Sequence, residues 1–167
     1  MNAAPSDALV FFGATGDLVF NKIFPALYAM ERRGSLRVPV IGIARSDWSI
    51  EQFRARARAS VDKHGSFDET VFARLQERLR YLSGDYGASA THAALRKELG
   101  AAAHPLHYLA IPPSVFASVV EGLGQSGCAR GARNQRIGPR AGGHHQDDRH
   151  HSRRRPQPHP LSGNRSE

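Results

Sequence analysis

The sequence has little of several features that would place it in a specialised class. It holds one cysteine, Cys128, in 167 residues, which excludes a disulfide within the chain. No run of about 18 apolar residues occurs, so the sequence predicts no membrane span. The first seven residues contain no lysine or arginine and therefore do not predict a secretory signal. Together these absences favour a cytoplasmic protein.

The net charge of +8 is unevenly distributed along the chain. Residues 1–127 carry 14 Lys and Arg against 12 Asp and Glu, whereas residues 128–167 carry nine Arg against three acids. A basic excess usually suggests nucleic-acid binding, but here it belongs to the C-terminal segment. Nucleic acid is therefore not an expected partner of the nearly neutral N-terminal part.

The composition also changes at about residue 128. The segment 128–167 contains no Phe, Tyr or Trp, and its large aliphatic side chains are Ile137 and Leu161. So little apolar surface cannot offset the entropy of ordering, which predicts a disordered, basic, low-complexity tail. Adjacent histidines at 144–151 have no scaffold to orient them, so they do not predict a dedicated metal site. The sequence thus predicts one domain over 1–127.

Within that domain, apolar runs alternate with helical patterns. Strands are predicted at 8–12, 38–44, 80–83 and 107–111, and helices at 16–33, 49–63, 68–79, 88–99 and 114–123. Pro25 falls inside the first helix and predicts a kink or boundary there. The alternation predicts an α/β fold with a doubly wound, Rossmann-like parallel sheet, incomplete at four strands.

The turn after the first predicted strand combines two glycines with a hydroxyl. A dinucleotide pyrophosphate needs a tight turn, close backbone approach and N–H groups at a helix N-terminus. Phe11 stands at the first glycine position of the G-x-G-x-x-G pattern, so an ordinary βα turn is the competing interpretation. The flanking strand, helix and second strand favour nucleotide binding. The candidate residues are Gly13, Ala14, Thr15, Gly16, Asp17 and Leu18.

Arg45 follows the second predicted strand, where the adenine ribose is read in such folds. An acid there would accept from a ribose 2′-hydroxyl, whereas the arginine fork matches a 2′-phosphate. Ser46 adds a hydroxyl, and Asp47 can point away from the site. This position favours NADP over NAD. Lys22, in the first helix, is on spacing alone better interpreted as a surface lysine.

Several segments together resemble the N-terminal domain of glucose-6-phosphate dehydrogenase. They are Phe12-Gly-Ala-Thr-Gly-Asp-Leu18, Lys22-Ile-Phe-Pro-Ala-Leu27, Ile41-Gly-Ile-Ala-Arg-Ser46, Gly84-Asp-Tyr86 and Tyr108-Leu-Ala-Ile-Pro-Pro-Ser114. The resemblance runs from about Ala8 to about Arg133.

The resemblance implies an enzyme of the pentose phosphate pathway that oxidises glucose 6-phosphate to the lactone and passes hydride to NADP. It implies that the residues from Gly13 to Leu18 hold the pyrophosphate and that Arg45 holds the 2′-phosphate. Asp85 and Tyr86 would line the cofactor site, and Lys22 would position the substrate. Family members also self-associate.

The sequence departs from that family after residue 133. The family continues with Glu-Lys-Pro-Phe-Gly and later supplies Arg-Ile-Asp-His-Tyr-Leu-Gly-Lys with its base, and neither motif is present here. The second domain is missing too. We therefore expect a truncated or frame-shifted chain that binds NADP and is inactive alone, with no catalytic residue assigned. The alternative is a non-catalytic NADPH-binding module whose basic tail docks to an acidic partner such as nucleic acid.

Overall fold

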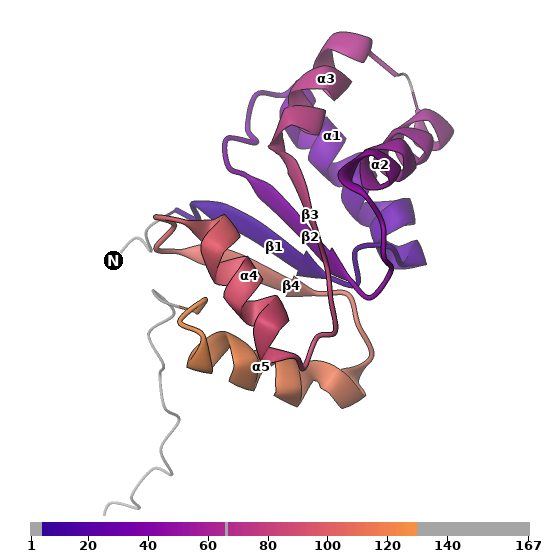
Figure 1. Cartoon of the computed structure of the whole chain (residues 1–167). Coiled ribbons are helices and arrows are strands. Elements are labelled where there is room, and N and C mark those ends of the chain that lie inside the picture. The colour runs from indigo at the N-terminus through magenta and orange to yellow at the C-terminus, as the bar shows by residue number, and fades with distance from the viewer. Residues whose placement is uncertain (1–4, 66, 130–167) are drawn as a thin grey trace, which may run out of the picture. The chain divides into compact units, whose positions relative to one another are not determined.

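The computed structural model describes residues 5–65 and 67–129, and within them a four-stranded parallel sheet has the order β3-β2-β1-β4 (Figure 1). The strands are β1 (Ala8–Phe12), β2 (Val40–Ala44), β3 (Leu79–Ser83) and β4 (Pro105–Leu109). β1 is central and pairs with β2 on one side and β4 on the other. The chain adds strands outward from β1 and then returns to its other side, which confirms the predicted doubly wound α/β fold.

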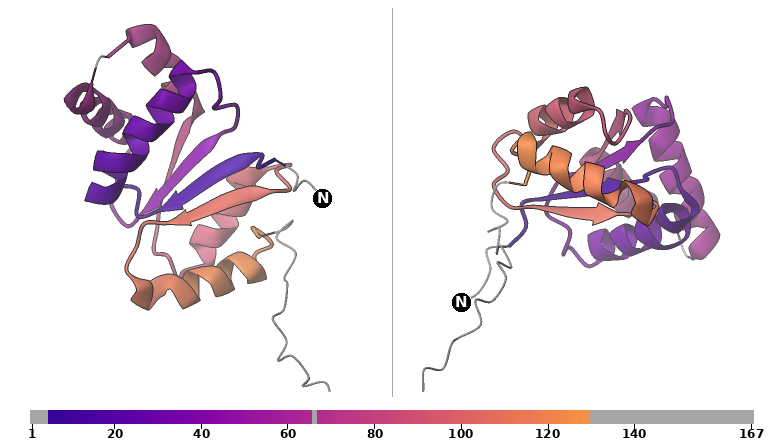
Figure 2. Two further views of the ribbon diagram at one scale, coloured as in Figure 1. Left: turned by 180° about the vertical axis from the view of Figure 1, so that it is seen from behind. Right: turned by 90° about the horizontal axis from the view of Figure 1, so that it is seen from below.

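Helices cover both faces of the sheet (Figure 2). One face is covered by α1 (Phe24–Arg32), α2 (Ile50–His64) and α3 (Glu69–Arg78), and the other by α4 (Ser89–Leu99) and α5 (Phe116–Gln125). Side chains of β1 alternate between the two layers, since Phe11 joins the first core and Val10 and Phe12 join the second. A strand that is buried on both faces has to be apolar throughout, as this one is.

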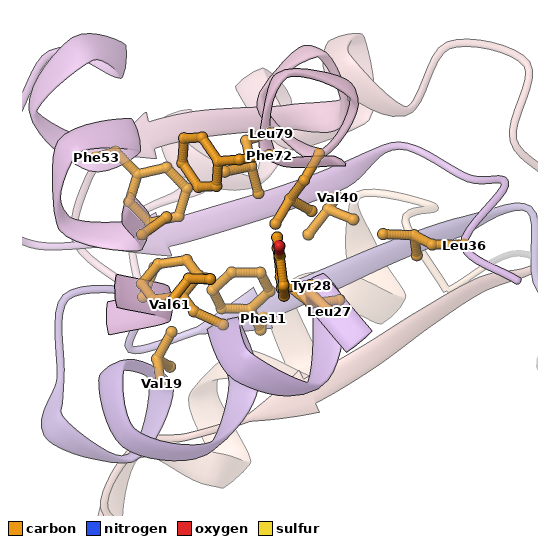
Figure 3. Close-up of a cluster of buried hydrophobic side chains, with 14 of the residues drawn as sticks. Phe11, Val19, Leu27, Tyr28, Leu36, Val40, Phe53, Val61, Phe72 and Leu79 are labelled. Carbon is orange, nitrogen blue, oxygen red and sulfur yellow. The ribbon is translucent and has the colours of Figure 1, made fainter. Parts of the chain in front are cut away.

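The core beneath α1 and α2 is built around Phe53 (Figure 3). The centroid of its ring lies 5.4 Å from that of Phe24 and 4.9 Å from that of Tyr81. Gly42 of β2 makes room for this ring, because a Cβ at position 42 would lie 2.6 Å from Phe53 and 2.9 Å from the Cβ of Ala14. Phe53 therefore packs against the sheet and against the turn that follows β1.

The helix after β1 begins with a π-helical turn, Val19–Ile23, and continues as α1. The N–H of Phe24 donates to the carbonyl of Val19, five residues back. Pro25 follows at the start of α1, where its missing N–H and bulky ring cannot continue a regular helical ladder. The wider turn accommodates this proline, which confirms the predicted boundary at Pro25.

Side-chain caps fix the starts of α2 and α3. The Oγ of Ser49 accepts from the N–H of Gln52, and the Gln52 side chain accepts from the N–H of Ser49. This arrangement confirms the predicted capping box. The carboxylate of Asp68 accepts from the N–H groups of Thr70 and Val71 at the start of α3.

Glu31 joins α1 to α3. Its side chain is only 3% exposed, and its carboxylate lies 3.3 Å from Nε of Arg74 and 2.7 Å from Nε of Arg78. A buried carboxylate needs such partners, because an unpaired charge in an apolar layer is costly. The two guanidinium groups therefore allow α3 to pack beside α1.

The predicted position of the fourth strand, 107–111, is wrong by two residues, because β4 spans Pro105–Leu109. Pairing with β1 sets the register, because Ala8 and Phe12 of β1 stand opposite the two ends of β4. A proline at the first position of a strand is readily accommodated. After the strand, the N–H of Ala110 donates to the carbonyl of Phe12 before the chain turns towards α5.

The second core lies beneath α4 and α5 and includes Cys128. The Nε2 of His107 donates to the carbonyl of Cys128 at 3.0 Å, and the thiol of Cys128 lies 3.4 Å from the carbonyl of His92. Packed structure thus includes the first residues of the segment predicted as a tail. The rest of that segment, 130–167, with its histidine and arginine runs, lies outside the described residues.

Among the helices of the described part, none is both long and apolar enough to cross a bilayer.

Candidate functional site

The candidate residues gather at one edge of the sheet. All strands are parallel, so their carboxyl ends meet at the same edge. Gly13–Leu18 follow β1, Arg45 and Ser46 follow β2, and Asp85 and Tyr86 lie shortly after β3. Segments that are far apart in sequence therefore surround one place, where ligands bind in doubly wound folds.

Glycine is required at position 13 by the fold itself. Gly13 has φ +85°, and a Cβ there would overlap the carbonyl oxygen of Ala110 after β4. The N–H groups of Gly13 and Ala14 both donate to the carbonyl of Ile43, at 2.9 and 3.0 Å. The N–H of Gly16 donates to the carbonyl of Gly13 at 2.9 Å. These residues shape the turn against β2 and β4, and their amides are already engaged.

The remaining amides of the turn are available to a ligand. In the described structure, no backbone hydrogen bond from outside the helix engages the N–H groups of Thr15, Asp17 and Leu18. They stand at the beginning of the helical segment, where N–H groups lack intrahelical partners and the helix dipole favours an anion. Sequence reasoning assigned the whole turn as donors, and the structure narrows that set to these amides.

Two hydroxyl groups connect the turn after β1 with the end of β2. The Oγ1 of Thr15 lies 3.0 Å from the Oγ of Ser46, within hydrogen-bond distance. The backbone carbonyl of Ser46 also accepts from the hydroxyl of Tyr81 at 2.6 Å. The position of Ser46 is therefore fixed from two sides, directly beside Arg45.

The guanidinium of Arg45 has two neighbours from the loop after β3. Its Cζ lies 5.1 Å from the ring centroid of Tyr86, a cation–π distance, and its Nε lies 3.1 Å from Oδ2 of Asp85. The Arg45 and Asp85 side chains are 60% and 58% exposed. Within the described part of the chain, the two Nη groups of this guanidinium form no hydrogen bond or ion pair, so these donors are available to an anion.

Burial is the largest influence on the pKa values of the two tyrosines of the site. Burial raises the pKa of Tyr86 above its ordinary value, against the opposing effects of the Arg45 charge and of the N–H groups of Arg45 and Gly13. Burial, with smaller contributions from Tyr86 and Asp47, raises the pKa of Tyr81 to about 12. Both phenols therefore stay protonated at neutral pH and serve as neutral walls and donors.

Lys22 and Asp17 point into solvent near the turn. Lys22 lies on the π-helical turn and is exposed, and no ion pair or hydrogen bond of its side chain occurs among the described residues. The side chain of Asp17 is 96% exposed, and one of its oxygens lies 3.7 Å from Arg56. The guanidinium of Arg56 in turn stacks on Phe20 at 4.7 Å and on Trp48 at 5.7 Å.

Sequence reasoning missed part of this site. Tyr81 sits within β3, and only the pairing of β3 with β2 places its hydroxyl at Ser46. The contact between Asp85 and Arg45 also depends on two loops that follow different strands. A tyrosine within the third predicted strand was the available signal for the position of Tyr81, and no local pattern indicates the contact between Asp85 and Arg45.

A known protein family matches most of this chain. The family model described as glucose-6-phosphate dehydrogenase, NAD binding domain, matches residues 10–137. This chain belongs to the glucose-6-phosphate dehydrogenase family. The segment from Gly13 to Leu18, Arg45 and the loop with Asp85 and Tyr86 all lie inside the matched range.

Individual members of this family are similar to the chain. Glucose-6-phosphate 1-dehydrogenase 1 of Mycobacterium tuberculosis is 44% identical over 118 residues, covering 71% of this chain and 25% of that protein. Glucose-6-phosphate 1-dehydrogenase of Chlamydia muridarum is 34% identical over 133 residues, covering 72% of this chain and 26% of that protein. The chain therefore spans about a quarter of the length of these glucose-6-phosphate dehydrogenases.

Solved structures of the family have a fold similar to that of this chain. The crystal structure of glucose-6-phosphate 1-dehydrogenase from Mycobacterium avium superposes with a TM-score of 0.71 at 44% identity, covering 74% of this chain and 27% of that chain. A glucose-6-phosphate dehydrogenase in complex with its substrate, glucose 6-phosphate, superposes with a TM-score of 0.67 at 30% identity. That match covers 75% of this chain and 28% of the other.

Proposed function

We propose that this chain binds NADP at the carboxyl edge of its sheet and forms the cofactor-binding part of a glucose-6-phosphate dehydrogenase. Residues 1–127 would be the NADP-binding domain, and 128–167 a basic tail, of a cytoplasmic enzyme. In the whole enzyme, hydride would pass from glucose 6-phosphate to NADP, giving the lactone. Membership of the family supports this assignment.

The observation that carries the proposal is the contact between Thr15 and Ser46 at 3.0 Å. It joins the turn with the available amides to the residue beside Arg45. A dinucleotide that carries a 2′-phosphate needs both features within reach of one molecule, a helix N-terminus for the pyrophosphate and a guanidinium for the extra phosphate. The side chain of Tyr86, stacked on Arg45, would complete the wall beside the ribose.

The resemblance gives Lys22 a role at the substrate. Its side chain is exposed on the π-helical turn, which follows the amides proposed for the pyrophosphate. A lysine there can direct a flexible cation towards a sugar phosphate or hydroxyl bound beyond the cofactor. We expect Lys22→Ala to leave NADP affinity unchanged while weakening glucose 6-phosphate binding to the NADP complex.

As a separate polypeptide of 167 residues, the chain would bind cofactor without turnover. Oxidation at the sugar requires a base that removes the hydroxyl proton as hydride leaves, and its loss costs orders of magnitude. The sequence contains neither family motif that supplies this base. We expect no NADPH formation from glucose 6-phosphate and NADP, and turnover above trace rate would contradict this part of the proposal.

The binding experiment is a calorimetric titration of NADP and NAD into wild-type protein and Arg45→Ala. Fluorescence of Trp48, the single tryptophan and three residues beyond Arg45, gives a second readout. Loss of a charged hydrogen bond costs about 1.5–3 kcal/mol. We therefore expect Arg45→Ala to weaken NADP binding by that amount and to leave NAD nearly unchanged.

The matched control is Arg33→Ala. It removes the same charge from an exposed position at the end of α1. This variant should bind NADP like wild type. Equal losses in the two variants, or wild-type protein that binds neither nucleotide, would refute the proposed site.

A further inference from the structure

The site contains a carboxylate as well as a guanidinium at the place where the adenine ribose would bind. The Oδ2 of Asp85 lies 3.1 Å from Nε of Arg45, so a group held by this guanidinium is also near the carboxylate. The two side chains favour opposite ligands. A guanidinium attracts a 2′-phosphate, whereas a carboxylate repels it and accepts from a 2′-hydroxyl.

Asp85 is anchored independently of Arg45. Its other oxygen, Oδ1, accepts from the N–H of Gly87 at 2.8 Å, closing a tight turn after β3. This bond remains when a ligand engages the guanidinium. The negative charge of Asp85 therefore stays in the site after a phosphate arrives.

The carboxylate contributes little to holding Arg45 in place. The pair is more than half exposed, and such pairs add little stability. Their contact has no hydrogen bond within the described structure, and the ring of Tyr86 supports the guanidinium independently at 5.1 Å. The dominant effect of the Asp85 charge on a bound nucleotide is thus direct repulsion of phosphate and attraction of a hydroxyl.

We propose that Asp85 is a specificity-determining residue that lowers the preference of this site for NADP over NAD. Its carboxylate opposes the 2′-phosphate held by Arg45 and accepts a hydrogen bond from the ribose hydroxyl of NAD. The inference rests on the proposed function, because it assumes that this site binds a nicotinamide dinucleotide.

The test is Asp85→Asn, because an asparagine retains an oxygen that can accept from the N–H of Gly87 and removes only the charge. NADP and NAD are titrated calorimetrically into each protein at low salt and at high salt. We expect the variant to bind NADP about threefold to tenfold more tightly and NAD about threefold more weakly. The gain for NADP should shrink at high salt, since screening weakens charge repulsion.

Asp47→Asn is the matched control. It removes the same charge two residues from Arg45, at an exposed position without an ion pair to Arg45 in the described structure. A ratio of NADP to NAD affinity that rises in Asp85→Asn alone supports the proposal. An equal rise in Asp47→Asn would indicate a general charge effect and overturn it.

The remaining outcomes distinguish failure of the proposed function from failure of the role proposed for Asp85. If wild-type protein binds neither nucleotide, the proposed function fails. If wild type binds NADP but Asp85→Asn leaves NADP affinity unchanged or weakens it, only the role of Asp85 fails. Where NAD binding is too weak to measure, the change in NADP affinity decides alone.

Discussion

Replacing Gly13 by alanine tests how the turn after β1 is built. Gly13 and Gly34 both have positive φ, +85° and +68°, so an alanine at either position adopts a strained backbone. At Gly34 nothing lies within 4 Å of an added Cβ, whereas at Gly13 the Cβ would overlap the carbonyl oxygen of Ala110. Gly34→Ala is therefore a matched control that carries the conformational cost without the steric one.

The expected losses of stability differ between the two variants. An alanine in the left-handed region costs about 1 kcal/mol of stability, which is the whole expected effect of Gly34→Ala. Gly13→Ala adds about 1–3 kcal/mol for displacing packed backbone. The displacement also disturbs the bond from the N–H of Ala110 to the carbonyl of Phe12. We expect a total loss of about 2–4 kcal/mol, a large share of the stability of a small domain.

The assay is urea unfolding followed by circular dichroism and by the fluorescence of Trp48. The slope of the unfolding free energy against urea concentration, the m-value, has to be the same for each protein. Gly13→Ala should unfold at clearly lower urea than Gly34→Ala. Equal midpoints for the two variants would show that β1 and β4 do not approach as closely at Gly13 as described. The reasoning about this turn would then be wrong.

Three further perturbations test the rest of the fold. Glu31→Ala leaves Arg74 and Arg78 without their shared carboxylate and should lower stability by about 1–3 kcal/mol in urea unfolding, and an unchanged midpoint would argue against this clamp. Asp68→Ala removes the cap of α3 and should cost about 1 kcal/mol in the same assay, whereas a cost near zero would contradict the cap. Burial lowers the pKa of His107 below its ordinary 6.5, so the unfolded chain binds protons more readily and stability should fall as the pH drops below 6.5. That fall should be smaller in His107→Gln, and identical pH profiles of unfolding would refute the assignment to this histidine.

Local sequence accounts for much of this protein. Ser49 with Gln52 predicts the start of α2, because a capping box acts within one helical turn. The apolar run of β1 predicts a strand buried on both faces, and Pro25 predicts the break before α1. Gly13 and Arg45 indicate a nucleotide site, since each follows a buried strand.

Only the tertiary structure decided how these pieces meet. The register of β4 and the location of Tyr81 depend on pairing with strands distant in sequence, and no local pattern encodes that pairing. For the same reason, the amides of Gly13 and Ala14 are engaged by Ile43 of β2, which leaves others for a ligand.

Asp85 lies beside Arg45 because β2 and β3 are neighbours in the sheet and each residue lies in the loop after one of these strands. Local sequence therefore determines which elements form and which side chains end them. Hydrogen bonds between strands determine which of those side chains face one another, because each bond joins residues that are separated along the chain by one or more whole helices.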